Sequence, residues 1–310
     1  MHSNRSDPSS PEQGFSGGRK RLIEVGPGLD LVLVKPEKAG ARYAADLSAE
    51  FWLIDDIHSR WSSGLHNLAV PPVPWISPIA RYGVPKPPNK YAEGLAFLER
   101  CVPIPPSLAV REVITLVAEL LKGLAAVYAV CGVINTDIKP GNVMLGATGP
   151  RSRLPKRLVV VDWGLGTVLR RDSGVGGMGA DKFVPLSPGL GVGVNAFIAP
   201  PELLKYSAGG ERSLEACPIL TYQMAALLLC LIVPHATIKE ALDNKHGHSA
   251  VDARGQERFF IGQDTVRVLG DGFPLPFKDL LVQALGPDPA NRLSSELFGK
   301  ALLGFVGKVT

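Results

Sequence analysis

The chain has 310 residues, a net charge of +4 and an apolar share of 45%, with 34 glycines and 27 prolines. This length allows one large domain or two lobes around a buried core, and the composition excludes a wholly disordered chain. The small positive charge is spread along the sequence, so nothing in it indicates a nucleic-acid-binding protein.

Cysteine spacing and hydropathy argue against a disulfide-rich protein, a zinc protein and a membrane-spanning protein. The four cysteines lie far apart without a CxxC pair, which argues against a disulfide framework or a zinc site and fits a reducing, cytoplasm-like compartment. The longest apolar run, Met224 to Val233, is shorter than the roughly 20 residues that cross a bilayer, so no membrane span is predicted. Residues 1–20 are rich in Ser, Pro and Gly, lack the apolar stretch of a secretory signal, and are expected to form a flexible tail.

Residues 21–102 carry the pattern of a small, strand-rich unit. Arg21 to Lys35 reads RLIEVGPGLDLVLVK, two apolar segments around a Gly-Pro-Gly turn, which predicts a β-hairpin. Apolar residues at three- and four-residue steps predict an amphipathic helix over Ala44 to Trp61. Short strands are expected within Val73 to Gly83 and Glu93 to Val102, so the predicted order is β-β-α-β-β.

The sequence of residues 103–310 instead predicts mainly helices. Leu108 to Gly132 combines helix-forming residues with an apolar stripe and predicts a long helix. Two short apolar runs follow, and a glycine-rich stretch from Gly164 to Gly193 has no sustained periodicity, so we expect a long loop there. Further helices are predicted at Ile219–Val233, Pro276–Leu285 and Ser294–Phe305.

The residues directly after the long predicted helix carry the chemistry. Val133 to Gly146 reads VINTDIKPGNVMLG, and VVVDWGLG follows beyond a short basic loop. Phosphoryl transfer from ATP needs a carboxylate to orient the incoming hydroxyl, a cation near the γ-phosphate and oxygen ligands for magnesium, all held rigidly. The residues that supply these groups are Asp137, Lys139, Asn142 and Asp162.

These motifs resemble the eukaryotic protein kinase family, whose catalytic loop reads HRDLKPxN and whose metal loop reads DFG. The resemblance implies a two-lobed α+β fold, with lobes at 21–102 and 103–310, that uses ATP and Mg²⁺ to phosphorylate serine or threonine hydroxyls of a protein substrate. It implies that Asp137 is the catalytic aspartate and Lys139 the phosphate-facing lysine, with Asn142 and Asp162 as magnesium ligands.

The same resemblance implies a set of nucleotide-binding residues. Lys35, at the end of a predicted strand, would hold the α- and β-phosphates, and Glu50 of the amphipathic helix would form an ion pair with it, with Asp46, Asp55 and Asp56 of the same helix as alternatives. The adenine slot would be formed by Leu98, Glu99, Cys101 and Met144. Taken alone, Lys35 and Glu50 read as surface residues, whereas Leu98 and Met144 read as ordinary core residues.

Two motifs near the other end of the chain extend the resemblance. APPELL, which contains Glu202, resembles the APE motif of the kinases, and PDPANRLSSELF contains Arg292 where the family has a partner arginine. The resemblance implies a buried ion pair between Glu202 and Arg292. Taken alone, Glu202 is an ordinary carboxylate at the start of a helix.

The sequence also departs from the family. A clear GxGxxG loop is missing before Lys35, Asn135 and Thr136 stand in place of the usual His-Arg, and Leu220 aligns with the aspartate that anchors the catalytic loop. These departures favour an alternative, a pseudokinase that acts as a nucleotide-binding or scaffold protein. A kinase acting on a small molecule is a third interpretation, which the APE-like motif disfavours.

Within the family, the combination TDIKPGN, PPEL and YQ resembles the divergent rhoptry kinases of apicomplexan parasites, which implies secretion into a host cell. Divergent kinases of large DNA viruses or of GC-rich protists fit the composition comparably well. The leading interpretation is a divergent serine/threonine protein kinase.

Overall fold

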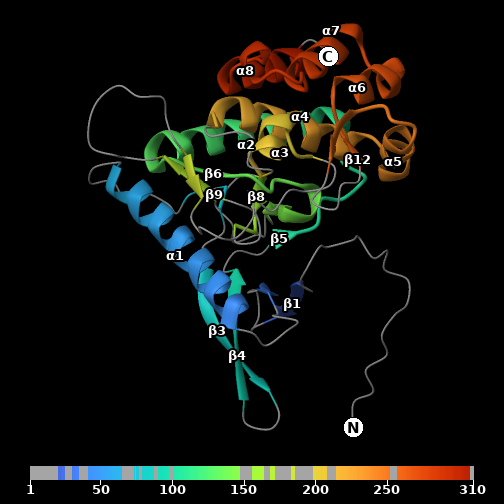
Figure 1. Ribbon diagram of the computed structural model, residues 1–310. Helices are drawn as coiled ribbons and strands as arrows, with labels where there is room; N and C mark the ends of the chain where they lie inside the picture. The colour runs from blue at the N-terminus through green and yellow to red at the C-terminus, as the bar shows by residue number, and fades with distance from the viewer. Residues whose placement is uncertain are drawn as a thin grey trace, which may run out of the picture.

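The structure is a computed structural model, and it describes most of the chain from Cys101 onwards together with segments before it. The described residues are 20–24, 30–34, 41–64, 73, 75–76, 79–86, 90–97, 101–146, 156–163, 168–171, 183–185, 198–207, 214–251 and 257–307. Helices α2 to α8 gather at one end of the molecule, strands β1 to β4 lie at the other, and α1 runs between them (Figure 1).

The N-terminal strands form one antiparallel sheet in the order β1-β2-β4-β3. β1 (Lys20–Glu24) and β2 (Asp30–Val34) pair as the predicted hairpin, with Ile23 opposite Leu31. β3 (Ile79–Lys86) pairs with β4 (Lys90–Phe97) over the whole length of both strands. The predicted order β-β-α-β-β is therefore confirmed, although β3 begins later than expected.

Helix α1 (Ala41–Gly64) contains the predicted amphipathic segment. Leu53, Ile54 and Ile57 are buried and belong to the same hydrophobic cluster as residues of α2, whereas Trp52 is exposed. The three-residue step from Ile54 to Ile57 places both side chains on one face, as the periodicity predicts. α1 contacts α2 as well as β3 and β4, so it joins the sheet to the helical part.

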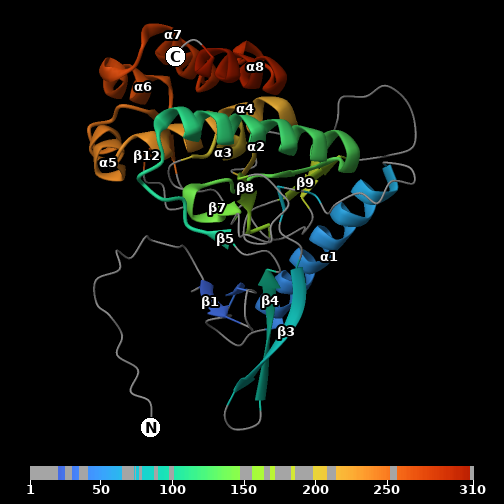
Figure 2. The same ribbon diagram turned by 180° about the vertical axis from the view of Figure 1, so that it is seen from behind.

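Helix α2 (Val110–Cys131) is the predicted long helix. It ends at Gly132, whose φ of 67° lies in the left-handed region, and the Gly132 N–H donates to the Tyr128 carbonyl. α2 lies across the helical part and packs against α4 (Ala216–Ile232) and α8 (Ser295–Val306) (Figure 2).

Helix α2 also meets the length and hydropathy of a membrane-spanning helix, and α4 with α5 (His235–Asp243) meets them jointly despite a bend of 117°. In α2, 56% of the most apolar window is buried inside the protein. Its apolar residues are thus explained by contacts with α1, α4 and α8.

Two small sheets lie next to α2. β5 (Cys101–Val102), β7 (Val143–Gly146) and β8 (Arg157–Val160) form one in the order β5-β7-β8. The other, in the order β10-β9-β6, consists of β6 (Val133–Asn135), β9 (Val168–Arg171) and β10 (Phe183–Pro185). β9 and β10 lie in the stretch expected to be a long loop. That expectation is therefore wrong for these segments, because strands of three or four residues are too short to show periodicity.

The remaining elements complete the helical part. The predicted helices are confirmed as α4, α7 (Leu275–Ala284) and α8. Elements that the sequence analysis did not predict are α3 (Pro201–Ser207), α5, α6 (Gln263–Leu269), the hairpin of β11 (His248–Val251) and β12 (Glu257–Phe260), and the 3₁₀ helices η1 (Pro140–Asn142), η2 (Gly270–Gly272) and η3 (Pro289–Asn291).

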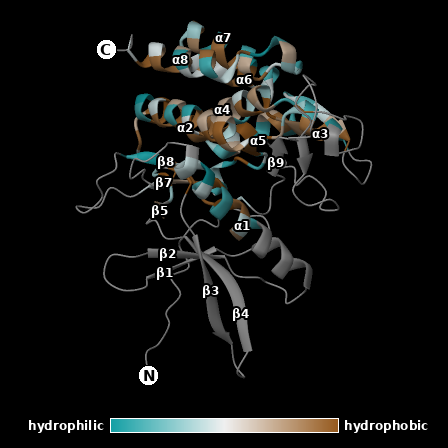
Figure 3. Ribbon diagram, turned by 90° about the vertical axis from the view of Figure 1, so that its left-hand side faces the viewer, coloured by the Kyte–Doolittle hydropathy of each residue, from teal (hydrophilic) through white to brown (hydrophobic). Residues whose placement is uncertain are grey.

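Helix α4 is the centre of this core. Its residues from Ile219 to Leu229 are all buried, which requires a helix that is apolar on every side. Its ribbon is accordingly hydrophobic over most of its length (Figure 3). α4 packs against α2, α7 and α8 and also contacts η1, so the core supports the loop that carries the kinase-like motif.

Candidate active site

The loop between β6 and η1 holds the predicted catalytic residue inside the protein. Residues Val133 to Ile138 are all buried, and the turn at Gly132 directs the chain from α2 into β6. Pro140 opens η1, where its fixed φ suits the first helical position. The local sequence therefore builds a rigid support for Asp137.

Asp137 is the centre of a hydrogen-bonded cluster. The Lys139 Nζ lies 2.7 Å from Asp137 Oδ2, and the Asn142 Nδ2 donates to the same oxygen at 2.9 Å. Burial raises the pKa of Asp137 above its ordinary value, and the Lys139 charge opposes this shift. Three of the predicted site residues are thus brought together.

Asn142 ties this loop to the strand that leads to the metal-loop motif. Its Nδ2 also donates to the Asp137 carbonyl at 3.0 Å, and its own carbonyl accepts the Val161 N–H at 2.9 Å. Asp162 follows Val161 directly and is buried. The negative charge of Asp162 contributes to the raised pKa of Asp137, so the two carboxylates are close enough to interact.

Glu50, on α1, contacts the backbone next to Asp162. It is 4% exposed, and its Oε1 accepts the backbone N–H of Trp163 at 2.8 Å. Glu50 is therefore not a surface residue of the helix. Its predicted partner Lys35 lies outside the described residues, so the ion pair stays a prediction.

The predicted adenine slot is described in part. Cys101 pairs with Gly146, and Met144 lies two residues before Gly146 on β7. Cys101 and Met144 therefore share one face of the β5-β7-β8 sheet, since alternate residues of a strand point to the same side. Cys101 is buried and Met144 is half-buried, while Leu98 and Glu99 lie outside the described residues.

The donor set fits magnesium better than a softer metal. Asn142 and Asp162 carry amide and carboxylate oxygens, which Mg²⁺ prefers, and Mg²⁺ commonly completes its shell with water and phosphate oxygens. Within the described part of the chain, no group of three or more His, Cys, Asp or Glu side chains could hold a metal by itself. The residues thus fit an ion that binds together with a nucleotide.

The predicted ion pair between Glu202 and Arg292 is confirmed and lies away from this cluster. The Arg292 guanidinium donates to both Glu202 oxygens, at 2.5 and 2.8 Å, and both side chains are buried. Arg292 also donates to the Gly286 carbonyl and covers the Tyr222 ring at 4.7 Å. This bidentate pair connects α3 with the segment before α8.

The sequence analysis missed His248, which lies beside Tyr222. The Tyr222 hydroxyl lies 3.0 Å from His248 Nε2 and also donates to the Ile261 carbonyl, while the His248 ring stacks on Phe260. Burial lowers the pKa of His248 to about 4. A histidine inside a short, unpredicted hairpin gives no signal in a single sequence.

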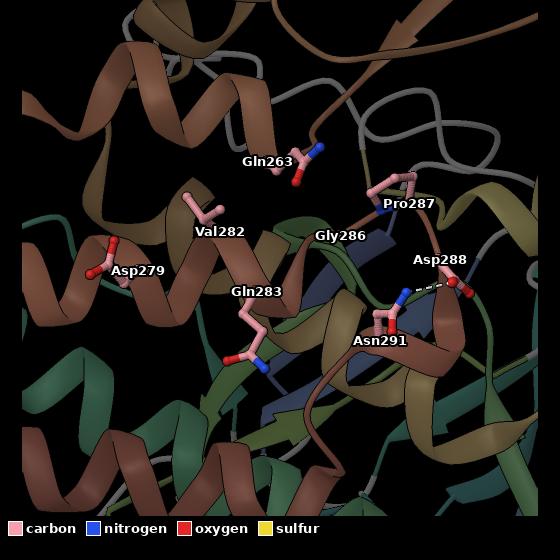
Figure 4. Close-up of a pocket in the computed structure, with 8 residues that line it drawn as sticks. All are labelled: Gln263, Asp279, Val282, Gln283, Gly286, Pro287, Asp288 and Asn291. Carbon is pink, nitrogen blue, oxygen red and sulfur yellow. Dashed lines mark hydrogen bonds between the residues drawn. The ribbon is translucent and has the colours of Figure 1, made fainter.

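A hollow of about 340 Å³ opens at a different place, between α6, α7 and η3 (Figure 4). Its lining residues are Gln263, Asp279, Val282, Gln283, Gly286, Pro287, Asp288 and Asn291. The Asp288 carboxylate accepts hydrogen bonds from the Ala290 N–H and the Asn291 side chain, so it caps η3. None of the predicted catalytic residues lines this hollow.

Comparison with known proteins gives one weak link to kinases. No protein-family model matches the chain. Over 86 residues the chain is 35% identical to a protein of Thermomonospora curvata described as "Probable serine/threonine-protein kinase PkwA". The match covers 28% of this chain and 9% of that protein, so the chain spans only a small part of its relative. It hints at a kinase relationship, while the resemblance to rhoptry kinases stays a prediction.

Proposed function

We propose that the chain is a divergent serine/threonine protein kinase that transfers the γ-phosphate of ATP to a protein hydroxyl. The observation that carries the proposal is the buried cluster in which Lys139 and Asn142 both donate to the Asp137 carboxylate, beside Asp162. The weak similarity to a serine/threonine kinase supports the same class of protein.

The proposed architecture is the two-lobed α+β fold of that family, with a smaller lobe at 21–102 and a larger helical lobe at 103–310. The four-stranded sheet, the helix α1 beside it and the helical part built on α4 support this proposal. So does the carboxylate of Glu50, because it reaches from α1 to the backbone beside Asp162.

In the proposed reaction, Asp137 orients the substrate hydroxyl and accepts its proton. The hydroxyl oxygen forms a bond to the γ-phosphorus while the bond from this phosphorus to the bridging oxygen breaks, which leaves ADP. Lys139 stabilises negative charge on the phosphoryl oxygens, and Cys101 and Met144 contribute to the adenine slot. Bound Mg²⁺, which Asn142 and Asp162 would hold, supplies charge neutralisation of the phosphates.

A pseudokinase that binds nucleotide or acts as a scaffold is the second candidate function. The absence of a GxGxxG motif before Lys35 favours it, because backbone N–H groups of such a loop bind phosphate. Leu220, where the family has an anchoring aspartate, is buried in α4 and carries no acceptor. Phosphate transfer decides between the two candidates.

The direct test is magnesium-dependent autophosphorylation, or phosphorylation of a general protein substrate, by the purified chain and its Asp162→Asn variant. We expect the variant to lose about a hundredfold or more in rate, since one preorganised group commonly contributes that much. Asp271→Asn is the matched control, because it makes the same chemical change on an exposed carboxylate in η2. Equal rates in wild type and Asp162→Asn would contradict the metal assignment, and no transfer in wild type would favour the pseudokinase.

A further inference from the structure

One side chain links the loop of Asp137 to that of Asp162. The Asn135 Nδ2 donates to the Asp162 carbonyl at 2.7 Å, and its Oδ1 accepts the Asp137 N–H at 2.8 Å. Asn135 is 1% exposed, and both bonds are buried. Both ends of one amide group are therefore used, one towards each loop.

The link acts between two groups that repel each other. Asp137 and Asp162 are both buried, and as carboxylates they carry like charges. A pair of like charges moves apart unless the surrounding backbone is fixed. Because a hydrogen bond in a buried, low-dielectric site is stronger than in water, the two bonds of Asn135 oppose this separation.

Helix α4 beneath the loop offers no carboxylate anchor in its place. Leu220 is apolar, and the buried Oε1 of Gln223 has no hydrogen-bond partner in the described part of the structure. The two loops are also connected by the pairing of β7 with β8, in which Val143 lies opposite Val160, and by the hydrogen bond from the Val161 N–H to the Asn142 carbonyl. Asn135 adds to these a direct side-chain link between the backbone at Asp137 and the backbone at Asp162.

We propose that Asn135 is a positioning residue that holds the Asp137 loop and the Asp162 loop at the separation required for magnesium-dependent nucleotide binding. This inference rests on the proposed kinase function for its ligand. In the sequence, Asn135 is only a departure from the family pattern, whereas in this proposal it has a structural role. Asn135 itself touches neither the substrate nor the metal in this assignment.

Two substitutions separate the two bonds. Asn135→Ser retains a hydroxyl that can accept the Asp137 N–H two residues on, as in an ST turn, but is too short to reach the Asp162 carbonyl. Asn135→Leu keeps the approximate shape and removes both bonds. Thr221→Val is the matched control, because it removes two hydrogen bonds of one side chain, from Thr221 Oγ1 to the Leu293 carbonyl and to the Ser295 hydroxyl, which join α4 to the start of α8 and not to the site.

The first measurement is calorimetric binding of ATP as MgCl₂ is titrated. For Asn135→Ser we expect half-saturation to need about 10- to 100-fold more magnesium, the range typical of groups that orient metal ligands. Thr221→Val should shift only the melting temperature. If Asn135→Ser lowers the melting temperature but leaves the magnesium dependence equal to that of Thr221→Val, the proposal is wrong.

The second measurement, hydrogen exchange, needs no ligand. Asn135→Ser should speed exchange in residues 156–163 while residues 133–142 stay protected, and Asn135→Leu should speed exchange in both. If wild type binds no ATP with magnesium, the kinase function fails, and exchange alone then decides whether Asn135 links the loops. Exchange in Asn135→Ser equal to wild type would overturn the link, even if Asn135→Leu does not fold.

Discussion

Lys139 lies close enough to Asp137 to control its acidity. Burial and the Asp162 charge favour the protonated carboxyl, whereas the Lys139 charge and the hydrogen bonds from Lys139 and Asn142 favour the carboxylate. The balance leaves the pKa of Asp137 above its ordinary value. In the proposed reaction only the ionised carboxylate can accept a proton, so this balance sets the acid limit of activity.

Replacing Lys139 by Met should move the acid limb of the pH–rate profile to higher pH. The ammonium lowers the pKa of Asp137, and its removal lets burial raise that pKa further. The check is the rate of phosphate transfer between pH 4 and 8, compared with Lys239→Met, which alters an exposed ion pair with Asp243. An acid limb that stays in place, whatever happens to the maximal rate, would refute the assignment of Asp137 as proton acceptor.

The sequence allowed some site residues to be predicted because their chemistry and spacing are local. Asp137, Lys139 and Asn142 lie within one short motif, and the structure places them in one cluster. The hydrogen bond between Glu50 and the Trp163 backbone could not be predicted, because every residue except proline has a main-chain N–H, and the identity of the donor residue therefore gives no signal in the sequence. The two hydrogen bonds of Asn135 could not be predicted for the same reason, since both of its partners are backbone groups.

Among the elements, α2 makes an unusually close approach to the segment before β3. A Cβ atom at Gly123 would lie 2.0 Å from Cδ2 of Trp75, which is closer than any normal contact. The Trp75 carbonyl accepts the Val160 N–H at 2.9 Å, and Ile76 pairs with Val160. The segment is therefore held between α2 and β8 and cannot easily move aside.

Gly123→Ala should consequently destabilise the protein by about 1 to 2 kcal/mol, because overpacking outweighs the gain in helix propensity. Gly304→Ala in α8 is the control, since a Cβ atom there meets nothing within 4 Å. That change should stabilise the protein by up to about 1 kcal/mol. Urea unfolding of both variants checks the difference, and equal stability would show that Trp75 does not pack on Gly123.

The elements that could be predicted are the long ones. α1, α2, α4 and α8 each span several turns, so their apolar periodicity is repeated often enough to be read. β9, β10 and the hairpin of β11 and β12 have three or four residues each, which is too short to show periodicity, and β9 also pairs with β6, which lies far from it in the sequence. The lone pairing of Ile76 with Val160 is of the same kind.

At the scale of the whole molecule, the free energy of unfolding should depend on pH in the acid range partly because of His248. Its folded pKa, about 4, lies below the ordinary 6.5, chiefly because burial disfavours the charged ring and Arg292 adds repulsion. The neighbouring Asp264 and the hydrogen bond to the Ala199 backbone act in the opposite direction. The unfolded chain therefore binds more protons between pH 6.5 and 4, and stability is lost as the pH falls through this window.

We expect this group to account for at most about 3 kcal/mol of acid destabilisation, the energy equivalent of the pKa difference. His248→Gln removes the titration and keeps a polar group beside Tyr222. Its free energy of unfolding should fall less steeply than that of wild type between pH 6.5 and 4, as measured by denaturant titration. His246→Gln, on an exposed neighbour, should behave like wild type. Parallel curves for wild type and His248→Gln would contradict the prediction.

A buried cysteine at the contact between α1 and α2 can be used to measure how often this contact opens. The Cys131 thiol is buried at the end of α2, its Sγ lies 3.7 Å from the Ile57 carbonyl, and burial raises its pKa. A thiol-directed reagent reacts with the thiolate and needs access, so it can modify Cys131 only when α1 separates from α2. The exposed Cys217 calibrates the reagent in the same sample. The labelling rate of Cys131 thus measures how often the end of α2 and α1 separate at Ile57.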